Sequence, residues 1–305
     1  MNIFDAFQLI LPLFLIILLG WMLFKVKVAT AGWVKVLNEF AFYIGLPTLS
    51  FLSLYTLDIR SFDSAIVLSN ALFFAAALGV TFAVTIFVPT PPQIGSVVIL
   101  SVLFGNIAYM GFPMNEMVFG AAGLSAAVVV CAIHNVLYFI FAVAAAEYRS
   151  GRNVSYRVLF VKICKVPILW AVLLGVIFAY FQISLPALFV VPMKMLANAS
   201  SAIVLLALGV FLATISFRQY VRQALLITLF KLVALPLIFW LIALIFRLEP
   251  LHFSVSMLQA AMPVAISVFT IADNMGLDKE LAASSVFITT LLSVVTLPVL
   301  VALLT

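Results

Sequence analysis

Charged residues are scarce in this 305-residue chain. Lys and Arg number 15, and Asp and Glu number 10, so 8% of the residues are charged, against about 25% in soluble domains. So few charges cannot build a water-exposed surface, which excludes a cytosolic enzyme, a disordered chain and a nucleic-acid-binding protein. The 67% of hydrophobic side chains instead indicate a protein embedded in lipid.

Cysteine and histidine are also rare. The two cysteines, Cys131 and Cys164, lie in apolar stretches and have no metal-ligand or redox spacing. The two histidines, His134 and His252, are far apart, and neither has a nearby nucleophile with an orienting acid. A phosphate-binding G-x-x-x-x-G-K-[ST] segment is missing as well. We therefore expect neither an enzyme nor an ATP-driven pump, and no cofactor other than a coupling Na⁺ or H⁺.

Long apolar runs make up most of the sequence. A spanning helix needs about 20 apolar residues, and turn-forming or charged residues divide the chain into ten such runs. We predict an all-α membrane protein with ten transmembrane helices. The expected spans are 4–24, 34–55, 64–88, 94–119, 123–147, 158–181, 186–214, 222–246, 253–275 and 280–304.

The basic residues predict the orientation, because Lys and Arg collect in cytoplasmic loops. With the amino terminus outside, eleven of the 15 basic residues lie at the inner side. They are Lys25, Lys27, Lys35, Arg149, Arg152, Arg157, Lys162, Lys165, Arg218, Arg222 and Lys279. We therefore expect both termini outside.

The chain has an internal symmetry around its basic linker, residues 149–157, with five predicted helices in residues 1–148 and five in 158–305. The fourth and ninth helices each carry a proline in mid-span, Pro113 and Pro263. Five helices per half place the halves in opposite orientation, which is the inverted repeat of many secondary transporters. In such proteins the substrate site lies where broken helices meet near the midplane, so we expect helices 4 and 9 to be broken and crossed there.

Predicted helix 4 supplies the first candidate site. Gly111 and Pro113 weaken the helix, and freed backbone groups are tolerated in a membrane only where protein or a water-filled cavity satisfies them. Asn106, Tyr109 and Asn115 stand beside them as candidate substrate-binding residues. The alternative is a simple proline kink filled by neighbouring helices.

Predicted helix 9 supplies the second candidate site, with Gln259, Pro263 and Ser267. Half-helices after the two breaks would direct positive amino-terminal ends at the bilayer centre, which suits a carboxylate, while carbonyl ends could hold a cation. His134 and Asn135 in predicted helix 5 are further candidates, although such residues often only bond between helices.

Three ionisable residues are candidates for ion coupling. Glu116 and Asp273 follow the two predicted breaks, where a buried carboxylate could carry a proton, although Asp273 is far enough along to be a solvated helix end. Lys231 lies nine residues beyond Arg222 in predicted helix 8. It could meet an anionic substrate or an acid, but we expect its long stem to carry the ammonium to the membrane interface.

Several motifs resemble the auxin efflux carrier family and follow one another in order over nearly the whole chain. They are Asn38-Glu39-Phe40 leading to Tyr43-Ile44-Gly45-Leu46-Pro47, Gly105-Asn106 through Gly111-Phe112-Pro113, Leu208-Gly209-Val210, Ala261-Met262-Pro263, and Thr289-Thr290-Leu291-Leu292-Ser293. The short basic linker is similar to that of small prokaryotic members.

The resemblance implies a fold like that of bile acid sodium symporters, with two inverted five-helix repeats and scaffold and transport domains that each draw helices from both repeats. It implies Asn106, Pro113 and Pro263 as residues of the crossing, and small organic anions such as malate, malonate or auxin-like carboxylates as substrates. Val264 stands where plant members have a glutamine, which favours a smaller carboxylate.

We therefore expect a secondary active transporter in the bacterial inner (plasma) membrane, working by elevator-type alternating access. An anion channel or facilitator of the same fold is the alternative. The expected partners are a small carboxylate and the lipid bilayer, with no nucleic acid, and a homodimer stays open.

The predicted topology can be tested with single cysteines at positions 2 and 304, in a chain whose two natural cysteines are replaced. A membrane-impermeant thiol reagent should label both positions from the outside of intact cells, because both termini are expected there. Labelling only after the cytoplasmic side is opened would reverse the orientation.

Overall fold

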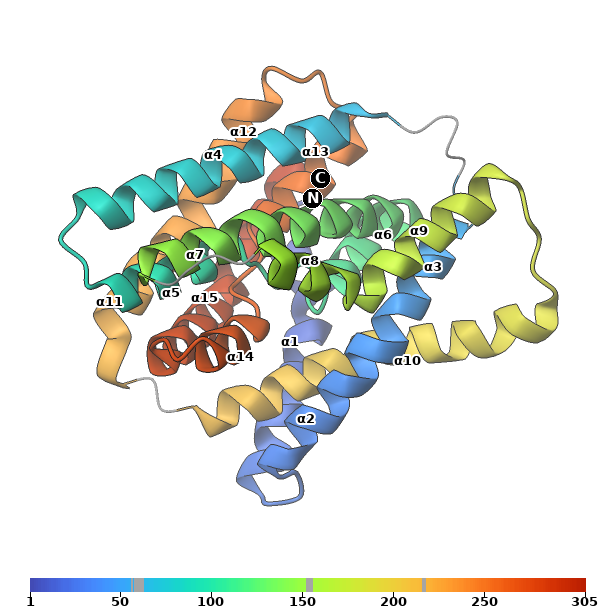
Figure 1. The fold of residues 1–305 in the computed structure, drawn as a ribbon. Helices are drawn as coiled ribbons and strands as arrows, with labels where there is room; N and C mark the ends of the chain where they lie inside the picture. The colour runs from blue at the N-terminus through green and yellow to red at the C-terminus, as the bar shows by residue number, and fades with distance from the viewer. Residues whose placement is uncertain (56, 58–62, 152–155, 216–217) are drawn as a thin grey trace.

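The structure is a computed structural model that describes residues 1–55, 57, 63–151, 156–215 and 218–305. Within these ranges the chain is helical, and no β-strand forms beyond one isolated bridge (Figure 1). Arg152 of the orientation prediction, and with it residues 152–155 of the predicted linker, lies outside the described residues.

Six helices within the described residues are long and apolar enough to cross a membrane. They are α1 (Ile3–Lys25), α4 (Ala65–Phe87), the stretch Gly111–Arg149, α10 (Ala187–Thr214), the stretch Val221–Ala243 and α15 (Lys279–Leu304). Each covers most of one expected span, and Gly111–Arg149 also covers the end of the span 94–119. Large side chains such as Phe87 and Leu303 are 84% and 78% exposed, as lipid-facing residues are.

The other four expected spans consist of shorter helical pieces. They are α2 (Ala31–Phe40) with α3 (Leu46–Tyr55), α5 (Pro92–Leu103) with the start of α6 (Gly111–Leu137), α8 (Tyr156–Cys164) with α9 (Pro167–Tyr180), and α13 (Pro250–Ala260) with α14 (Ser267–Asn274). Gly120 ends the short first part of α6 with φ 68° and ψ −161°, a conformation open to glycine. The chain therefore turns between expected spans 94–119 and 123–147.

Three helices contain a π-helical segment, in which one extra residue widens the turn. Such segments are frequent at functional sites. The segments are η1 (Ala41–Gly45) between α2 and α3, η3 (Tyr138–Ala142) between α6 and α7 (Val143–Arg149), and η5 (Phe230–Ala234) between α11 (Val221–Leu229) and α12 (Leu235–Ala243). A short 3₁₀ turn, η4 (Arg218–Tyr220), precedes α11.

The helices pack in two groups. The first group contains α1, α2, α3, α9 and α10, and α1 lies along α10. The second group contains α4, α5, α6, α7 and α11 to α15, with α13 against α6 and α11 against α15. The groups meet where α1 contacts α15 and where α3 contacts α6. Both termini lie side by side, because residues 1–4 and residues 299, 302 and 303 line one cavity (Figure 1).

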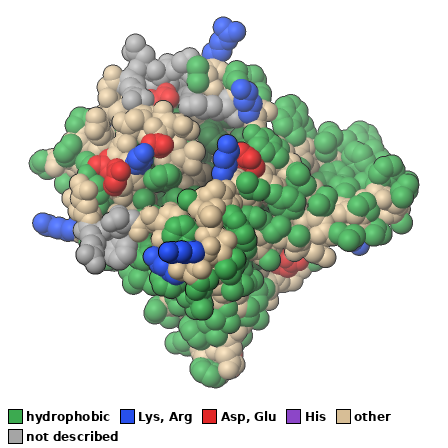
Figure 2. Space-filling model, turned by 90° about the horizontal axis from the view of Figure 1, so that it is seen from below, with side chains coloured by type: hydrophobic (Ala, Val, Ile, Leu, Met, Phe, Trp, Pro, Cys, Tyr) green, Lys and Arg blue, Asp and Glu red, His purple; other side chains and the backbone are tan. Residues whose placement is uncertain are grey.

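The surface fits a lipid environment. Hydrophobic side chains cover most of the face in Figure 2, and the charged side chains gather on one part of it. The nearness of the two termini agrees with an even number of membrane crossings.

Two glycines set the distance between α1 and α10. A Cβ at Gly20 would collide with the carbonyl oxygen of Leu206, and a Cβ at Gly209 would collide with that of Ile17. Small residues allow such close helix contact in membranes, where dispersion replaces the hydrophobic effect as the driving force.

Replacing Gly209 with Ala should therefore force the first group apart. Overpacking of this kind costs about 1–3 kcal/mol, so the melting temperature of the purified protein should fall by roughly 2–10 °C. Gly79→Ala is the matched control, because nothing lies within 4 Å of a Cβ there. If Gly209→Ala has the same melting temperature as Gly79→Ala, then α1 and α10 can separate without loss of stability.

Candidate functional site

Two membrane-buried segments interrupt helices in the second group. Residues 104–110 separate α5 from α6, and residues 261–266 separate α13 from α14. We call these two segments the paired breaks. Their residues are almost all buried, so their backbone groups cannot rely on bulk water for hydrogen bonds.

The two segments satisfy part of each other's backbone. The amide of Asn106 donates a hydrogen bond to the carbonyl of Pro263 at 2.6 Å, and the amide of Ala265 donates one to the carbonyl of Phe104 at 3.1 Å. Proline itself can donate no backbone hydrogen bond, but its carbonyl accepts one here. Chain positions about 160 residues apart are thus joined by main-chain atoms in the manner of a minimal antiparallel ladder.

Thr289 of α15 holds the paired breaks from one side. Val264 lies opposite Gly105 in the antiparallel bridge, and its amide donates to the Thr289 hydroxyl oxygen at 3.0 Å. That hydroxyl donates in turn to the carbonyl of Ser285 at 2.7 Å. Thr289 thereby provides the acceptor for the backbone N–H of Val264, which points away from the bridge.

A cavity of about 130 Å³, the inner cavity, lies against the paired breaks. Its polar lining includes Asn106, Tyr109, Asn135 and Ser267, and none of the described residues that line it is basic or acidic. Asn106 is 3% exposed, and its side-chain nitrogen has no hydrogen-bond partner among the described residues. An orphaned buried donor of this kind calls for an acceptor from a ligand or water.

Helix α14 adds main-chain donors to the inner cavity. It begins at Ser267 without a side-chain cap, and Ile266 and Ser267 both line the cavity. Their amides make no hydrogen bond to another described residue. Free amides at a helix start carry a partial positive charge and bind anions.

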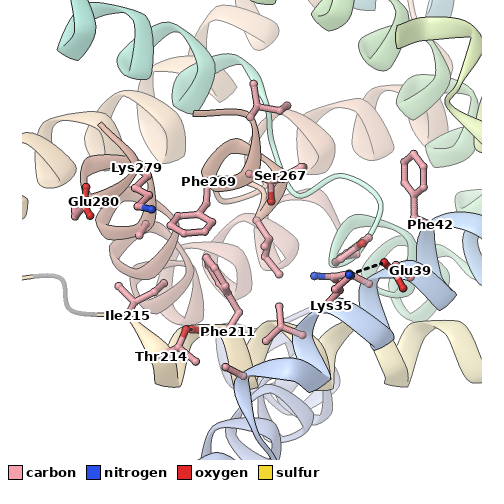
Figure 3. A pocket seen from close by; sticks show the side chains of 18 of the residues that line it. Lys35, Glu39, Phe42, Phe211, Thr214, Ile215, Ser267, Phe269, Lys279 and Glu280 are labelled. Atoms are coloured by element: carbon pink, nitrogen blue, oxygen red, sulfur yellow. Dashed lines mark hydrogen bonds and ion pairs between the residues drawn. The ribbon is translucent and has the colours of Figure 1, made fainter. Parts of the chain in front are cut away.

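A larger cavity of about 880 Å³, the vestibule, lies next to the inner cavity. It lies between α2 and α10 of the first group and α14 and α15 of the second (Figure 3). The two cavities share five lining residues and therefore lie next to each other. These are Phe42, Tyr109, Phe139, Ile266 and Ser267.

Charged residues stand at the sides of the vestibule. Lys35 and Glu39 form an ion pair of 3.9 Å on one side, and Lys279 and Glu280 lie on the other (Figure 3). Lys279 also pairs with Asp273 at 2.9 Å. The exposure of these pairs makes them weak contributors to stability, but they surround the entrance with water-compatible groups.

Of the helix 4 candidates, Asn106 and Tyr109 lie within the first break, and the others follow it in α6. The interruption is one turn earlier than the expected one at Gly111 and Pro113, since Gly111 starts α6 and Pro113 sits in its first turn, where a missing N–H breaks no helical bond. Asn115 is buried and donates to the Gly111 carbonyl at 2.7 Å. Gly111 allows close packing, because a Cβ there would collide with the Gln259 carboxamide.

His134, Gln259 and Lys231 come together in a third, very small cavity of about 10 Å³. The expectation that Lys231 reaches the interface is wrong: its side chain is 3% exposed and lies against Gly105 of the paired breaks. His134 therefore lines a different cavity from its neighbour Asn135, which faces the inner cavity and donates to Cys131 Sγ at 3.2 Å.

The two carboxylate candidates lie outside these cavities. Glu116 is exposed and lines neither the inner cavity nor the vestibule. Asp273 is half-exposed in its pair with Lys279 at the far end of α14, which is the solvated helix end considered above. Neither carboxylate is placed to meet a ligand bound at the paired breaks.

Sequence reasoning missed several lining residues. Phe42 and Phe139 belong to the π-helical segments η1 and η3, and both line the inner cavity. Phe104 stacks on Tyr138 with ring centroids 3.9 Å apart beside the first break. Phe42 lies inside the motif from Asn38 to Pro47, so the motif could have marked it as a lining residue. Nothing in the sequence marked Phe104 or Tyr138.

A family model described as "Membrane transport protein" matches residues 5–301. A protein of Methanothermobacter thermautotrophicus named "Uncharacterized transporter" is 26% identical over 295 residues, covering 95% of this chain and 96% of that protein. A Rhizobium meliloti protein named "Putative malonate transporter" is 27% identical over 305 residues, covering 94% and 92%. "Uncharacterized transporter YfdV" of Escherichia coli K12 is 24% identical over 201 residues, or 63% of each chain.

The family and these relatives are named as transporters and not as enzymes, in agreement with the absence of a catalytic constellation from the sequence. Together with the apolar spanning helices, they make the chain an integral membrane protein. Because the family model covers nearly the whole chain, the protein belongs to the membrane transport protein family, which is the auxin efflux carrier family that its motifs resemble.

Proposed function

We propose that the protein is a secondary active transporter that carries small organic anions by elevator-type alternating access. The inner cavity is the observation that carries this proposal. It offers the unpartnered side-chain nitrogen of Asn106 and the free backbone amides at the start of α14, all of which are hydrogen-bond donors. A buried cluster of donors favours an anion, and a carboxylate can accept several hydrogen bonds at once.

The proposed architecture has ten membrane-spanning helices in two inverted five-helix repeats, residues 1–148 and 158–305, joined by the linker 149–157. The paired breaks support this architecture, since each break falls within the fourth expected helix of its repeat and the two breaks are hydrogen-bonded to each other. The first helix group would be the scaffold domain and the second the transport domain, so that each draws helices from both repeats.

The size of the inner cavity favours a short-chain acid. Its volume of about 130 Å³ is well below the roughly 300–1,000 Å³ of pockets that hold drug-sized ligands. Malonate or malate fits this size better than an indole acid. The name of the Rhizobium meliloti relative points to the same substrate class.

The two groups of helices suggest how such an anion would move. The vestibule separates α2 and α10 from α14 and α15, while Phe42 from the first group and Phe139 from the second both line the inner cavity. Sliding one group past the other would close this entrance and open the opposite one. Lys35 and Lys279 belong to the predicted inner set of basic residues, so the vestibule would face the cytoplasm, with both termini outside.

An anion channel or facilitator of the same fold is the second candidate. A channel would need a continuous pore, whereas the paired breaks, which line the inner cavity, are joined to each other by main-chain hydrogen bonds. Saturable uptake at a low turnover rate would favour the carrier, and flux that stays linear with concentration would favour the channel.

Asn106→Ala should abolish most of the uptake of malonate or malate into proteoliposomes. Losing one hydrogen bond to a charged group costs about 1.5–3 kcal/mol, which corresponds to a roughly tenfold or greater loss of substrate affinity. Asn198→Ala is the matched control, because Asn198 is an exposed residue of α10 that lines neither cavity. Unchanged uptake by Asn106→Ala, with the wild-type protein active, would remove the site from the inner cavity.

A further inference from the structure

Lys231 is buried in the second helix group, in the π-helical segment η5. Its Nζ lies so close to the paired breaks that a Cβ added at Gly105 would be 3.0 Å away from it. Gly105 and Ile107 line both the small cavity of Lys231 and the inner cavity. The first break therefore lies between the lysine on one side and the proposed anion site on the other.

The buried ammonium has no acidic partner. Among the residues that the structure describes, no Asp or Glu forms an ion pair with Lys231, and none lines its cavity. Lysine is almost never fully buried unless its charge is compensated. Any charge on Lys231 must therefore be stabilised by groups other than a carboxylate.

Two helix ends lie beside Lys231. Leu103 is the last residue of α5 and Ala260 is the last residue of α13, and both line the cavity of Lys231. Each α-helix carries about half a negative charge at its carboxyl end, where a cation is stabilised. The ammonium thus sits where the carboxyl ends of the two half-helices meet.

Neutral side chains offer further acceptors. Gln259 is 1% exposed and His134 is 6% exposed, and both line the same cavity. Gln259 Oε1 and His134 Nε2 are buried and have no hydrogen-bond partner among the described residues. Both atoms can accept a hydrogen bond from an ammonium after a small movement, His134 in its Nδ1-protonated form.

The remaining space is too small for a hydrated cation. The cavity holds about 10 Å³, which is at most the space of one water molecule. A bare cation in that space would be repelled by an ammonium on Lys231.

We propose that the Lys231 ammonium is a tethered cation that replaces a soluble coupling cation at the carboxyl ends of α5 and α13. It neutralises the two helix ends beneath the paired breaks and keeps a positive charge next to the anion site without touching the anion. Transport by this protein is therefore independent of Na⁺. Only the uptake measurement below rests on the proposed function, because it requires that the protein transports a carboxylate. The melting temperatures do not depend on it.

The test compares five full-length proteins in proteoliposomes and in detergent: wild type, Lys231→Met, Lys231→Arg, Lys231→Ala and Lys194→Met. Methionine keeps most of the lysine stem and removes its charge, while arginine keeps the charge. Lys194 is an exposed residue of α10 away from both cavities, so its substitution controls for the loss of a lysine. Malonate uptake and the melting temperature are each measured in NaCl and in choline chloride.

The tethered cation predicts the same wild-type uptake and the same wild-type melting temperature in both salts. Lys231→Met should lose uptake roughly tenfold or more and melt at a lower temperature, whereas Lys231→Arg should retain both properties in part. In Lys231→Ala, which leaves an empty space, Na⁺ or methylammonium should raise the melting temperature and restore part of the uptake; choline is too large to do so. A lysine that only fills space would not show this restoration.

Two results would overturn the inference. One is a Lys231→Met protein that behaves like wild type in both assays, and the other is a wild-type protein whose uptake or melting temperature depends on Na⁺. A wild-type protein that takes up no carboxylate would instead contradict the proposed function. The melting temperatures of the variants in the two salts would still decide the role of Lys231.

Discussion

A peptide group inside a membrane must find a hydrogen-bond partner within the protein, and this constraint organises the centre of the molecule. Two helices stop in mid-span, and each interrupted segment supplies partners to the other: the carbonyl of Pro263 meets the amide of Asn106, and the carbonyl of Phe104 meets the amide of Ala265. The donors that remain open face the inner cavity, and the helix ends that carry negative charge face Lys231. The polarity of the site is thus mainly a property of the main chain.

The surroundings of the paired breaks divide into a tightly packed and a less regular part. In the first group, Gly20 and Gly209 bring α1 and α10 into backbone contact, which suits a rigid frame. The π-helical segments η1, η3 and η5 lie nearer the site, where they present Phe42, Phe139 and Lys231. An extra residue per turn redirects a side chain without ending the helix. The π-helical segments therefore direct these three side chains toward the site. A regular α-helix of the same sequence would direct them elsewhere.

Much of this arrangement could be predicted from the sequence, because apolar length and proline position are local signals. Pro263 was expected in a break and lies in one, and Asn106 lines the inner cavity, although its predicted role in binding a substrate stays a prediction. The first break was placed too late at Pro113, because a proline in the first turn of a helix looks the same in sequence as one that interrupts it.

The position of Lys231 could not be predicted, because its environment is made by helix ends distant in sequence. A lysine nine residues into an apolar helix normally extends to the interface, and nothing in η5 itself indicates that α5 and α13 end beside it. The same holds for the exposed position of Glu116, which depends on the turn at Gly120 and on which side of α6 faces its neighbours. Neighbouring elements, not local patterns, decide both cases.

The pairing of Gly105 with Val264 uses only atoms that every amino acid possesses. Mutations around it can therefore reshape the walls of the inner cavity while its frame stays in place. Relatives that share about a quarter of their residues with this chain could in this way come to handle different cargo by exchanging a few wall residues, with no need to evolve a new means of breaking a helix inside lipid.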